Sequence, residues 1–396
     1  MSRDRRRLTI ALYALVVFLF WGGQYLYIPT LPMYVQSKTA NLALVGFVLS
    51  MYGFWQAVVR VPLGIVADWV GWHKPFIAIG LMLSGVGAWV MGTATGVDGL
   101  AAGRAITGAA AANWVPLVVV FSDLFPPQEA VRASALLTFF NSAGRILATG
   151  ATGTLNDIGG YALAFFLATG FASLATLVML PIHEPRRAPQ RRAVAGIGRL
   201  MRRRDVLLPS LLSAVSQHVN WGVAYGFLPV LAKQFGATDV TLSMLTALQI
   251  GMFTLGNLFA SWTAKHISAS RLVYFGFVGL CIGVAGAAVV SSLPLLFAMQ
   301  AGIGLAMGVA YPVLMGMSIQ NVTGAERATA MGLHQTIYAI GMFAGPALSG
   351  GIAGAIGIQP MFAVTACACL ALGLIGTRAL ARSQAVSLET GGDTGD

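Results

Sequence analysis

The sequence predicts an all-α polytopic membrane protein, with twelve transmembrane helices in two six-helix bundles and both termini cytoplasmic. Three observations predict this class: a shortage of charge, a series of long apolar runs and an internal repeat. Of the 396 residues, 57% are hydrophobic and only 9% are charged, and the mean hydropathy is +0.77. Soluble domains carry about 25% charged residues, so this chain has too little charge for a water-exposed surface. A disordered chain and an ordinary soluble enzyme are therefore excluded.

A helix needs about 20 apolar residues to cross the hydrocarbon core of a membrane, and twelve runs reach or approach that length. The first six cover 8–34, 42–67, 75–94, 97–121, 132–155 and 160–181. The second six cover 207–232, 240–264, 272–290, 294–317, 327–352 and 358–380. We therefore expect four parts: a first bundle at 1–182, a basic cytoplasmic linker at 183–206, a second bundle at 207–382 and a cytoplasmic tail at 383–396.

The two expected bundles repeat each other in sequence. The recurring pairs include Trp21 and Trp221, Tyr25 and Tyr225, Pro29 and Pro229, Gly108 and Gly304, and Pro116 and Pro312. The matching residues occur in the same order in both halves, and the number of residues between the members of a pair changes only slightly along the chain. This indicates duplication of a six-helix unit. Parallel repeats are typical of transporters, in which a site between the halves is exposed to each side of the membrane in turn.

Basic residues outnumber acidic residues by 24 to 13, which gives a net charge of +11. In a soluble protein this excess would suggest nucleic acid binding, but the placement of the charges explains it better here. The segment 183–206 alone holds eight arginines, and short segments rich in Lys and Arg stay on the cytoplasmic side. We expect a multi-pass, monomeric protein of the cytoplasmic membrane that binds no nucleic acid. The linker could bind anionic lipid headgroups, or it could serve only as a positively charged connection.

The segment 64–74 reads GIVADWVGWHK. It resembles the loop signature of the major facilitator superfamily (MFS), in which a glycine, an aspartate and a second glycine precede basic residues. Arg104 and Gly108 are similar to the family's arginine-to-glycine motif in the fourth span, and 123–132 is similar to its connection into the fifth span. The resemblance covers the whole chain, and it implies the MFS fold and transport by rocking of the two halves.

The same resemblance implies a gate at the cytoplasmic end. In the family, the aspartate that corresponds to Asp68 holds the halves together when the inside is closed, and the N-terminus of a facing helix favours such an anion. Glycine at position 64 would let helices approach closely. Trp69 and Trp72 stand where the family commonly has arginine, which puts the usual charge relay in doubt. The expected gating residues are Gly64, Asp68, Gly71, Lys74, Asp123 and Arg132. A solvated loop carboxylate is the alternative for the aspartate.

Three arginines, Arg60, Arg104 and Arg145, lie within the expected spans. An ionised side chain at such depth costs about 3 kcal/mol or more, so it normally faces a cavity or a partner. The acidic residues all lie in loops, tails or span ends. Buried cations without buried anions favour an anionic ligand, because guanidinium matches carboxylate or phosphate. Arg104 could instead be structural and Arg60 could snorkel or pair with Asp68, which leaves Arg145 as the main ligand candidate.

Other polar residues in the spans could line the same site, although hydrogen bonds between helices explain them about as well. The expected substrate-binding residues are Arg145, Asn141, Arg60, Gln56, Arg104, Gln24, Tyr25, Gln217, Asn220, Tyr225 and Gln249. His218 and His334 are the candidate proton carriers, because histidine titrates near neutral pH. A histidine with a purely structural role in the core is the alternative for each.

We expect a secondary transporter of a small organic anion, with a proton as the coupling ion where one is used. The first alternative is a multidrug efflux transporter of the drug:proton antiporter type, which a buried acid would favour. The second is a transporter-like sensor that binds a ligand without moving it. The five histidines are scattered and the three cysteines lie in apolar runs, so we expect no catalytic site, no metal and no cofactor. No glycine-rich phosphate loop ending in Lys-Ser or Lys-Thr is present in the sequence, which argues against ATP hydrolysis.

Overall fold

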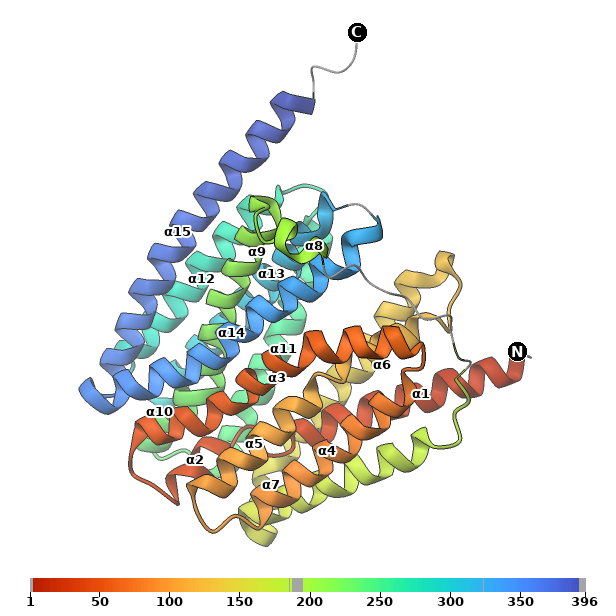
Figure 1. Ribbon diagram of the computed structural model, residues 1–396. Helices are drawn as coiled ribbons and strands as arrows, with labels where there is room; N and C mark the ends of the chain where they lie inside the picture. The colour runs from red at the N-terminus through yellow and green to blue at the C-terminus, as the bar shows by residue number, and fades with distance from the viewer. Residues whose placement is uncertain (1–2, 185, 187–194, 323, 392–396) are drawn as a thin grey trace.

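The computed structural model describes residues 3–184, 186, 195–322 and 324–391, and every regular element in these ranges is a helix (Figure 1). The first half contains α1 (Arg3–Tyr25), α2 (Leu31–Gln36), α3 (Leu42–Val70), α4 (Lys74–Gly92), α5 (Val97–Ala111), α6 (Trp114–Ser122), η1 (Pro127–Glu129) and α7 (Ala130–Met179). The second half contains α9 (Arg204–His218), the π-helix η2 (Val219–Phe227), α10 (Leu228–Gln234), α11 (Asp239–Thr263), α12 (Ala269–Val289), α13 (Leu293–Gln320), α14 (Gly324–Ile356) and α15 (Ile358–Gly391). The short helix α8 (Ala195–Leu200) lies between them in the chain.

The described helices account for the twelve expected spans. Ten segments are long and apolar enough to cross a membrane on length and composition alone. One of them, α7, contains two spans because its backbone leaves helical geometry at Gly159 and Gly160, where Gly160 has a φ of 67°. The seventh span is divided among α9, η2 and α10 and is therefore not counted as one long helix.

The first and seventh spans differ from the continuous helices that the apolar runs predict. Helix α1 ends at Tyr25 and α2 starts at Leu31, while η2 interrupts the seventh span at the equivalent place. Pro29 and Pro229 lie beside these interruptions, and proline cannot donate the backbone hydrogen bond that a regular helix needs. Hydropathy does not register this effect, because the residues on both sides are apolar.

The two halves share an apolar core at one end of the molecule and have separate cores at the other. We call the end where α1 begins and α15 finishes the termini end, and the opposite end the far end. One apolar cluster joins both halves and includes Tyr52, Trp221 and Met342. Two further clusters, built around Tyr13 and around Leu333, each belong to a single half and lie toward the termini end. The structure therefore shows a state in which the halves are joined at the far end.

Close backbone packing produces this junction. Helix α3 passes directly beside α14 (Figure 1), and a Cβ added to Gly350 would lie only 2.7 Å from the Cα of Gly46. Helix α7 crosses α11 in the same way, since a Cβ at Gly153 would clash with the backbone of Val240. Glycine is required at these crossings because any side chain would hold the helices apart.

Part of the basic linker packs against the second half. Leu200 at the end of α8 is fully buried and belongs to the same apolar cluster as Val206 and Val322, and Arg199 forms an ion pair with Glu326. Residues 187–194 of the expected linker lie outside the described part of the chain. At the other end of the second half, α15 continues as helix to Gly391, into the segment expected to be a tail, and 392–396 are not described.

Adjacent glycines on α14 provide a matched test of the far-end junction. We expect Gly350→Ala to lower the melting temperature, because its Cβ would meet α3 at 2.7 Å and such overpacking costs about 1–3 kcal/mol. Gly351→Ala should leave the melting temperature unchanged or raise it, since nothing lies within 4 Å of its Cβ position and alanine favours helix. Thermal unfolding of the two purified variants checks this, and equal effects would contradict the packing described here.

Candidate functional site

Arg145 joins the two halves near the middle of the bundle. Its guanidinium, from the first part of α7, lies 4.3 Å from the ring centroid of Tyr25 on α1. Its Nη2 donates a hydrogen bond of 3.2 Å to the hydroxyl of Tyr225, which belongs to the second half. The Nε of Arg145 is buried and has no hydrogen-bond partner among the described residues. Asn141, one helical turn earlier, is also half-buried.

Arg60 makes a second contact of the same kind. It is 3% exposed on α3, and its Nη1 donates a 2.6 Å hydrogen bond to the hydroxyl of Tyr338 on α14. Gln56 precedes Arg60 by one turn on the same helix face. The Oε1 of Gln56 and the Nε of Arg60 are both buried without a partner in the described part of the chain. The sequence left open that Arg60 pairs with Asp68. The hydrogen-bond partner that the structure shows for Arg60 is instead a tyrosine of the other half.

Arg104 is the most deeply buried of the three arginines. It is 1% exposed, and its guanidinium lies 4.4 Å from the ring centroid of Tyr52. Its Nε and Nη1 have no hydrogen-bond partner among the residues that the structure describes. Two unpaired donors on a buried cation are unusual, because an unsatisfied buried polar group destabilises a protein.

Tyr52 interacts with all three arginines. It interacts electrostatically with Arg60 and Arg104 and also with Arg145. In the described ranges, no ion pair involves any of these arginines. Cation–π contacts contribute about 0.5–2 kcal/mol each, whereas insertion of one charge costs about 3 kcal/mol or more. The tyrosines alone therefore do not offset the cost of this positive cluster.

Aromatic rings surround the Arg145 end of the cluster. Tyr25 lies edge-on to Tyr225 at 6.2 Å between ring centroids, and Tyr225 lies edge-on to Trp221 at 5.4 Å. Trp221 in turn stacks on Tyr52 at 4.9 Å. Trp21 completes the group 6.0 Å from Tyr25. This arrangement places flat apolar surfaces beside guanidinium donors, which suits an organic anion that carries a ring.

Several expected site residues form hydrogen bonds elsewhere in the structure. Asn220 donates to Gln217 at 3.4 Å and accepts from Gln249 at 3.0 Å, so these three form a polar chain inside the second half. Gln24 donates to the carbonyl oxygen of Thr107 at 3.3 Å and thereby connects α1 to α5 within the first half. For Gln24, a hydrogen bond between helices was the alternative to substrate binding, and the structure shows such a bond.

The two histidines differ in their surroundings. His334 is fully buried, and its Nδ1 lies 3.1 Å from the hydroxyl oxygen of Ser210. The same hydroxyl donates to the carbonyl oxygen of Val206 at 2.6 Å. The ring of His334 lies 6.0 Å from the ring of Tyr338, the partner of Arg60. His218 is half-buried, and its backbone carbonyl packs against Gly345.

At the termini end, the expected gating aspartate is held inside its own half. The carboxylate of Asp68 lies 3.3 Å from Nε2 of His73, and Nδ1 of His73 lies 3.3 Å from Glu184. Glu184 also accepts from the backbone N–H of Lys74 at 2.6 Å, so it caps the N-terminus of α4. The Nζ of Lys74 donates to the carbonyl of Leu180 at 2.6 Å. All these contacts lie within the first half, so in this state Asp68, His73, Lys74 and Glu184 hold the ends of α3, α4 and the segment after α7 together.

The two signature glycines have different environments. Gly71 ends α3 in the left-handed conformation with a φ of 65°, and its N–H bonds to the carbonyl of Ala67. This conformation strongly favours glycine. At Gly64, a Cβ would meet only Val115 at an ordinary 3.8 Å, so the close helix approach expected there is not made in this state and stays a prediction for the state closed at the termini end.

The connection into the fifth span contains a small ion-pair network. Arg132 pairs with Glu129 at 3.4 Å, and Glu129 also pairs with Arg6 at 3.3 Å. Glu129 lies only three residues from Arg132, so the two can meet within one helical turn. Asp123, the other acidic residue of this connection, is exposed at the end of α6.

Three aromatic residues of the site were not singled out from the sequence: Tyr52, Trp221 and Tyr338. A helical spacing could have found the first, because Tyr52, Gln56 and Arg60 follow one another at intervals of four along one face of α3. The same interval relates Trp221 to Tyr225 and His334 to Tyr338. No local pattern connects Arg60 to Tyr338, since that contact depends on how the halves pack.

These features define the class of protein. Two repeated six-helix bundles joined at one end, with buried cations between them, form the architecture of a membrane transporter. The family model of the Major Facilitator Superfamily matches residues 13–217 and 210–393. The chain therefore belongs to the Major Facilitator Superfamily, which confirms the expected fold and the expected transporter class and shows that the protein is not an enzyme.

The chain is similar to bacterial resistance proteins. It is 27% identical over 195 residues to the "Multidrug resistance protein 1" of Bacillus subtilis (strain 168), a match that covers 49% of this chain and 50% of that protein. It is 23% identical over 356 residues to the "Quinolone resistance protein NorA" of Staphylococcus aureus (strain MRSA252), which covers 85% of this chain and 87% of that protein. The chain thus spans about half the length of the first relative and most of the second.

Solved structures share the fold. A bacterial homologue of the human lysosomal transporter Spinster, in an inward-facing and unoccupied conformation, matches with a TM-score of 0.79 at 16% identity, over 96% of this chain and 98% of that chain. The nucleoside transporter NupG matches with a TM-score of 0.75 at 17% identity, over 95% of this chain and 98% of that chain. At these identities the likeness concerns the fold alone.

Glu184 should make the stability of the first half depend on pH. Its side chain is 2% exposed. Burial alone would raise the pKa of Glu184, but hydrogen bonds from the His73 side chain and from the backbone N–H groups of Lys74 and His73 outweigh burial and lower it. A carboxyl whose folded pKa lies below its unfolded value stabilises the fold above the unfolded pKa, and this contribution is lost as the pH falls through the folded pKa.

We therefore expect Glu184→Gln to lower the stability at pH 7 by about 1 kcal/mol, the usual effect of losing a helix cap. The difference from the unmodified protein should shrink below about pH 4, near the reference pKa of glutamate. Thermal unfolding across this range checks the prediction, with Asp157→Asn as the control because Asp157 is exposed at the far end. A difference that stays constant with pH would contradict the charged cap.

Proposed function

We propose that the protein is a secondary transporter of small organic anions whose central site is formed by Arg145 and the residues around it. The observation that carries the proposal is the cluster of three guanidiniums that interact with Tyr52, two of them buried and that of Arg145 half-buried, which has unpaired donors and no ion-pair partner in the described residues. An anionic ligand would satisfy these donors through charge-assisted hydrogen bonds, which are about twice as strong as neutral ones.

The contacts suggest how binding could be linked to movement of the halves. Arg145 and Arg60 each donate to a tyrosine hydroxyl of the second half, at 3.2 Å and 2.6 Å. A bound carboxylate or phosphate would compete for these donors while remaining next to the same tyrosines. In our proposal, Arg145 and Asn141 bind the anionic group, and Arg60 and Gln56 form a second polar position. The substrate thereby replaces direct contacts between the halves with contacts through itself.

The sidedness follows from the charge distribution in the sequence. If the termini and the arginine-rich linker are cytoplasmic, this state is open toward the cytoplasm and closed at the outer face. We propose that it takes up substrate from the cytoplasm, works as a monomer in the cytoplasmic membrane, and contacts anionic lipid headgroups through 183–206.

Proteoliposomes with and without anionic lipid test the lipid contact, and equal transport in both would exclude a functional role for it.

For coupling to protons, the geometry favours His334 over His218. His334 lies beside Tyr338, the hydrogen-bond partner of Arg60, so protonation of the imidazole would act on the arginine cluster through one residue. In proteoliposomes, we expect His334→Gln to abolish substrate transport that is driven by a pH gradient, while exchange of substrate without a gradient continues. Loss of both activities, or of neither, would exclude His334 as the proton carrier.

The alternative function is multidrug efflux. The printed names of two relatives favour it, and the aromatic rings next to Arg145 could bind flat drugs. Acidic or neutral aromatic drugs fit the same site as our proposed substrates. Lipophilic cations do not, because three guanidiniums would repel them. Vigorous export of cationic dyes would therefore support efflux of drugs and would contradict the anion proposal.

Ligand-induced thermal stabilisation tests the proposal, because a ligand that binds only the folded state raises the melting temperature. The panel should contain aromatic and aliphatic carboxylates, phosphate esters, lipophilic cations and neutral drugs. We expect one class of anions to stabilise the protein, and Arg145→Gln to weaken that ligand by about 10- to 100-fold, the usual effect of losing a charged hydrogen bond.

Arg271→Gln is the matched control in this experiment, because it removes an exposed arginine at the termini end and should leave binding unchanged. Arg145→Lys should restore only part of the affinity, since lysine keeps the charge but lacks the planar pair of donors. Stabilisation by lipophilic cations that is unchanged in Arg145→Gln would overturn the proposal.

A further inference from the structure

A cavity of about 570 Å³ lies at the termini end of the second half. Its walls come from the last turns of α11 and α13 and from the first turn of α12, and Arg327 near the start of α14 completes the lining. Ser261, Gly316 and Gln320 in this lining are exposed, so the cavity opens at the surface of the protein. Every lining residue belongs to the second half, and none of them is a residue of the central site.

The cavity changes from apolar to basic along the direction in which α13 crosses the membrane. Pro312 and Val313 line its deeper part, and Gln320, the last residue of α13, lines its outer part. Eight residues of helix rise about 12 Å, which is close to one leaflet of a hydrocarbon core about 30 Å thick. Trp262 near the end of α11 is 73% exposed, and exposed tryptophan is typical of the membrane interface. The apolar part of the cavity therefore lies at the depth of acyl chains, and its basic part lies at the depth of the headgroups.

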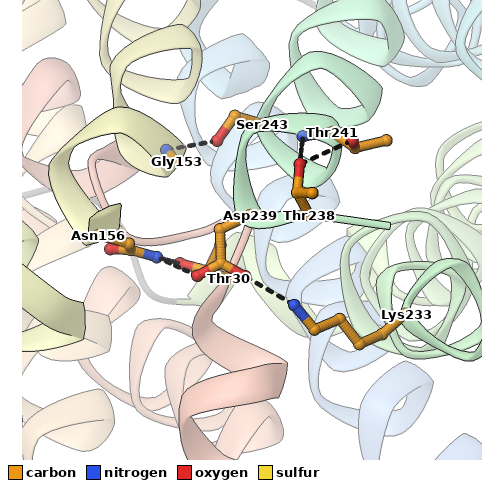
Figure 2. A network of polar contacts seen from close by, with 8 residues as sticks. All are labelled: Thr30, Gly153, Asn156, Lys233, Thr238, Asp239, Thr241 and Ser243. Carbon is orange, nitrogen blue, oxygen red and sulfur yellow. Dashed lines mark hydrogen bonds and ion pairs between the residues drawn. The ribbon is translucent and has the colours of Figure 1, made fainter. Parts of the chain in front are cut away.

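The charge around this cavity is positive and uncompensated. The sequence from 240 to 325 contains no Asp or Glu, while Lys265 and Arg271 are exposed beside the lining residues of the α11–α12 turn. In the described ranges, no ion pair involves Arg327. Other basic residues at helix ends of the second half have acidic partners: Arg199 with Glu326, Arg203 with Asp205, and Lys233 with Asp239 (Figure 2). An anionic ligand would supply the partner that Arg327 lacks.

The internal repeat shows that the equivalent place in the first half is filled by the protein itself. Pro116 of α6 corresponds to Pro312 of α13, so Val120 corresponds to Gly316. Val120 is 4% exposed and belongs to the apolar core of its half. A Cβ at Gly316, in contrast, would meet nothing within 4 Å. The cavity of the second half is open where the first half has a packed side chain.

The same comparison explains the uncompensated charge. The sequence Arg-Ala-Ser-Ala at 132–135 recurs as Arg-Ala-Thr-Ala at 327–330. In the first half, Arg132 pairs with Glu129, three residues earlier. The residue three positions before Arg327 is Gly324. The second half thus keeps the arginine of the repeat and lacks the carboxylate that balances it.

We propose that this cavity binds one anionic phospholipid from the leaflet at the termini end, with an acyl chain between α11 and α13 and its phosphate at Arg327. The apolar part removes the chain from its disordered neighbours, and the guanidinium forms a charge-assisted hydrogen bond with the phosphate. Because every lining residue belongs to the second half, the lipid stays bound while the two halves move. The site is separate from the linker at 183–206, and the inference does not depend on the substrate.

Lipid binding is measured on the full-length protein, purified in detergent and freed of lipid, by native mass spectrometry and thermal unfolding. The probes are phosphatidylglycerol, phosphatidylcholine with the same acyl chains, and glycerol 3-phosphate. We expect one tightly bound phosphatidylglycerol and a rise in melting temperature, with weaker binding of phosphatidylcholine, which has no net charge. Glycerol 3-phosphate has no acyl chain and should not stabilise the protein. Equal stabilisation by glycerol 3-phosphate would identify a site for free phosphate groups and overturn the lipid assignment.

A matched pair of glycine variants on α13 tests the apolar part. Gly316→Leu places a side chain in the cavity and should remove the tightly bound lipid. It should not lower the melting temperature of the lipid-free protein, because nothing lies within 4 Å of the Cβ position and leucine favours helix over glycine. Gly302→Leu is the control, since its Cβ position is equally open but does not line the cavity. It should keep the lipid.

A matched pair of arginine variants tests the basic part. Arg327→Gln should weaken phosphatidylglycerol by roughly tenfold, the effect of losing one charged hydrogen bond, and should leave phosphatidylcholine unchanged. Arg378→Gln removes an exposed arginine of α15 and should leave both lipids unchanged. The linker arginines are present in all four variants, so contacts of 183–206 with lipid do not account for the differences.

Tight phosphatidylglycerol binding that persists in Gly316→Leu, or that is lost equally in Gly302→Leu, would overturn the proposal. So would an unchanged affinity in Arg327→Gln. If Gly316→Leu does not fold, the comparison of Arg327→Gln with Arg378→Gln decides the question alone. Failure of this test leaves anion binding at Arg145 unaffected, and failure of the anion proposal leaves lipid binding at Arg327 unaffected.

Discussion

Direct backbone packing between the halves at the far end positions the rest of the structure. Where α3 meets α14, glycines bring the two helices into contact, and this contact aligns Arg60 with Tyr338 some turns further along. The crossing of α7 and α11 similarly places Arg145 next to Tyr225. The tyrosines of one half can reach the arginines of the other only because no side chains intervene at the far end. The far-end junction and the arginine–tyrosine contacts are therefore parts of one packing arrangement.

The central site then results from an electrostatic imbalance. Three arginines share one region with tyrosine rings and hydroxyl groups, and cation–π contacts of about 0.5–2 kcal/mol offset only part of an insertion cost of about 3 kcal/mol or more for each. A ligand of opposite charge would supply the missing stabilisation. At the far end the charges are balanced, because the carboxylate of Asp239 accepts hydrogen bonds from Lys233 and Asn156. The arginine cluster, in contrast, keeps buried donors without a partner among the described residues.

Sequence patterns were sufficient for the fold and insufficient for the partners within the site. Hydropathy predicted twelve spans, and the recurrence of Trp21, Tyr25 and Pro29 as Trp221, Tyr225 and Pro229 predicted two bundles, because both signals can be read along the chain without knowing how the helices pack. The interruptions near Pro29 and Pro229 were missed, since apolar residues continue through them. Arg145 and Tyr225 were both expected in the site, but the pairing of Arg60 with Tyr338 depends on how two distant helices pack. Likewise, Asp68 was placed at the gate from its motif, whereas its contact with His73 belongs to a state that the motif alone does not specify.

The most direct test of this account is counterflow in proteoliposomes with the anion that best stabilises the purified protein. Vesicles loaded with unlabelled anion are diluted into a trace of labelled anion, and the label inside is followed over time. The account predicts transient accumulation of the label above its equilibrium level, which requires a carrier that exchanges substrate between the two sides, and the loss of this peak in Arg145→Gln. Binding without any accumulation would identify a sensor instead of a transporter, and accumulation that persists in Arg145→Gln would contradict the central role of the arginine cluster.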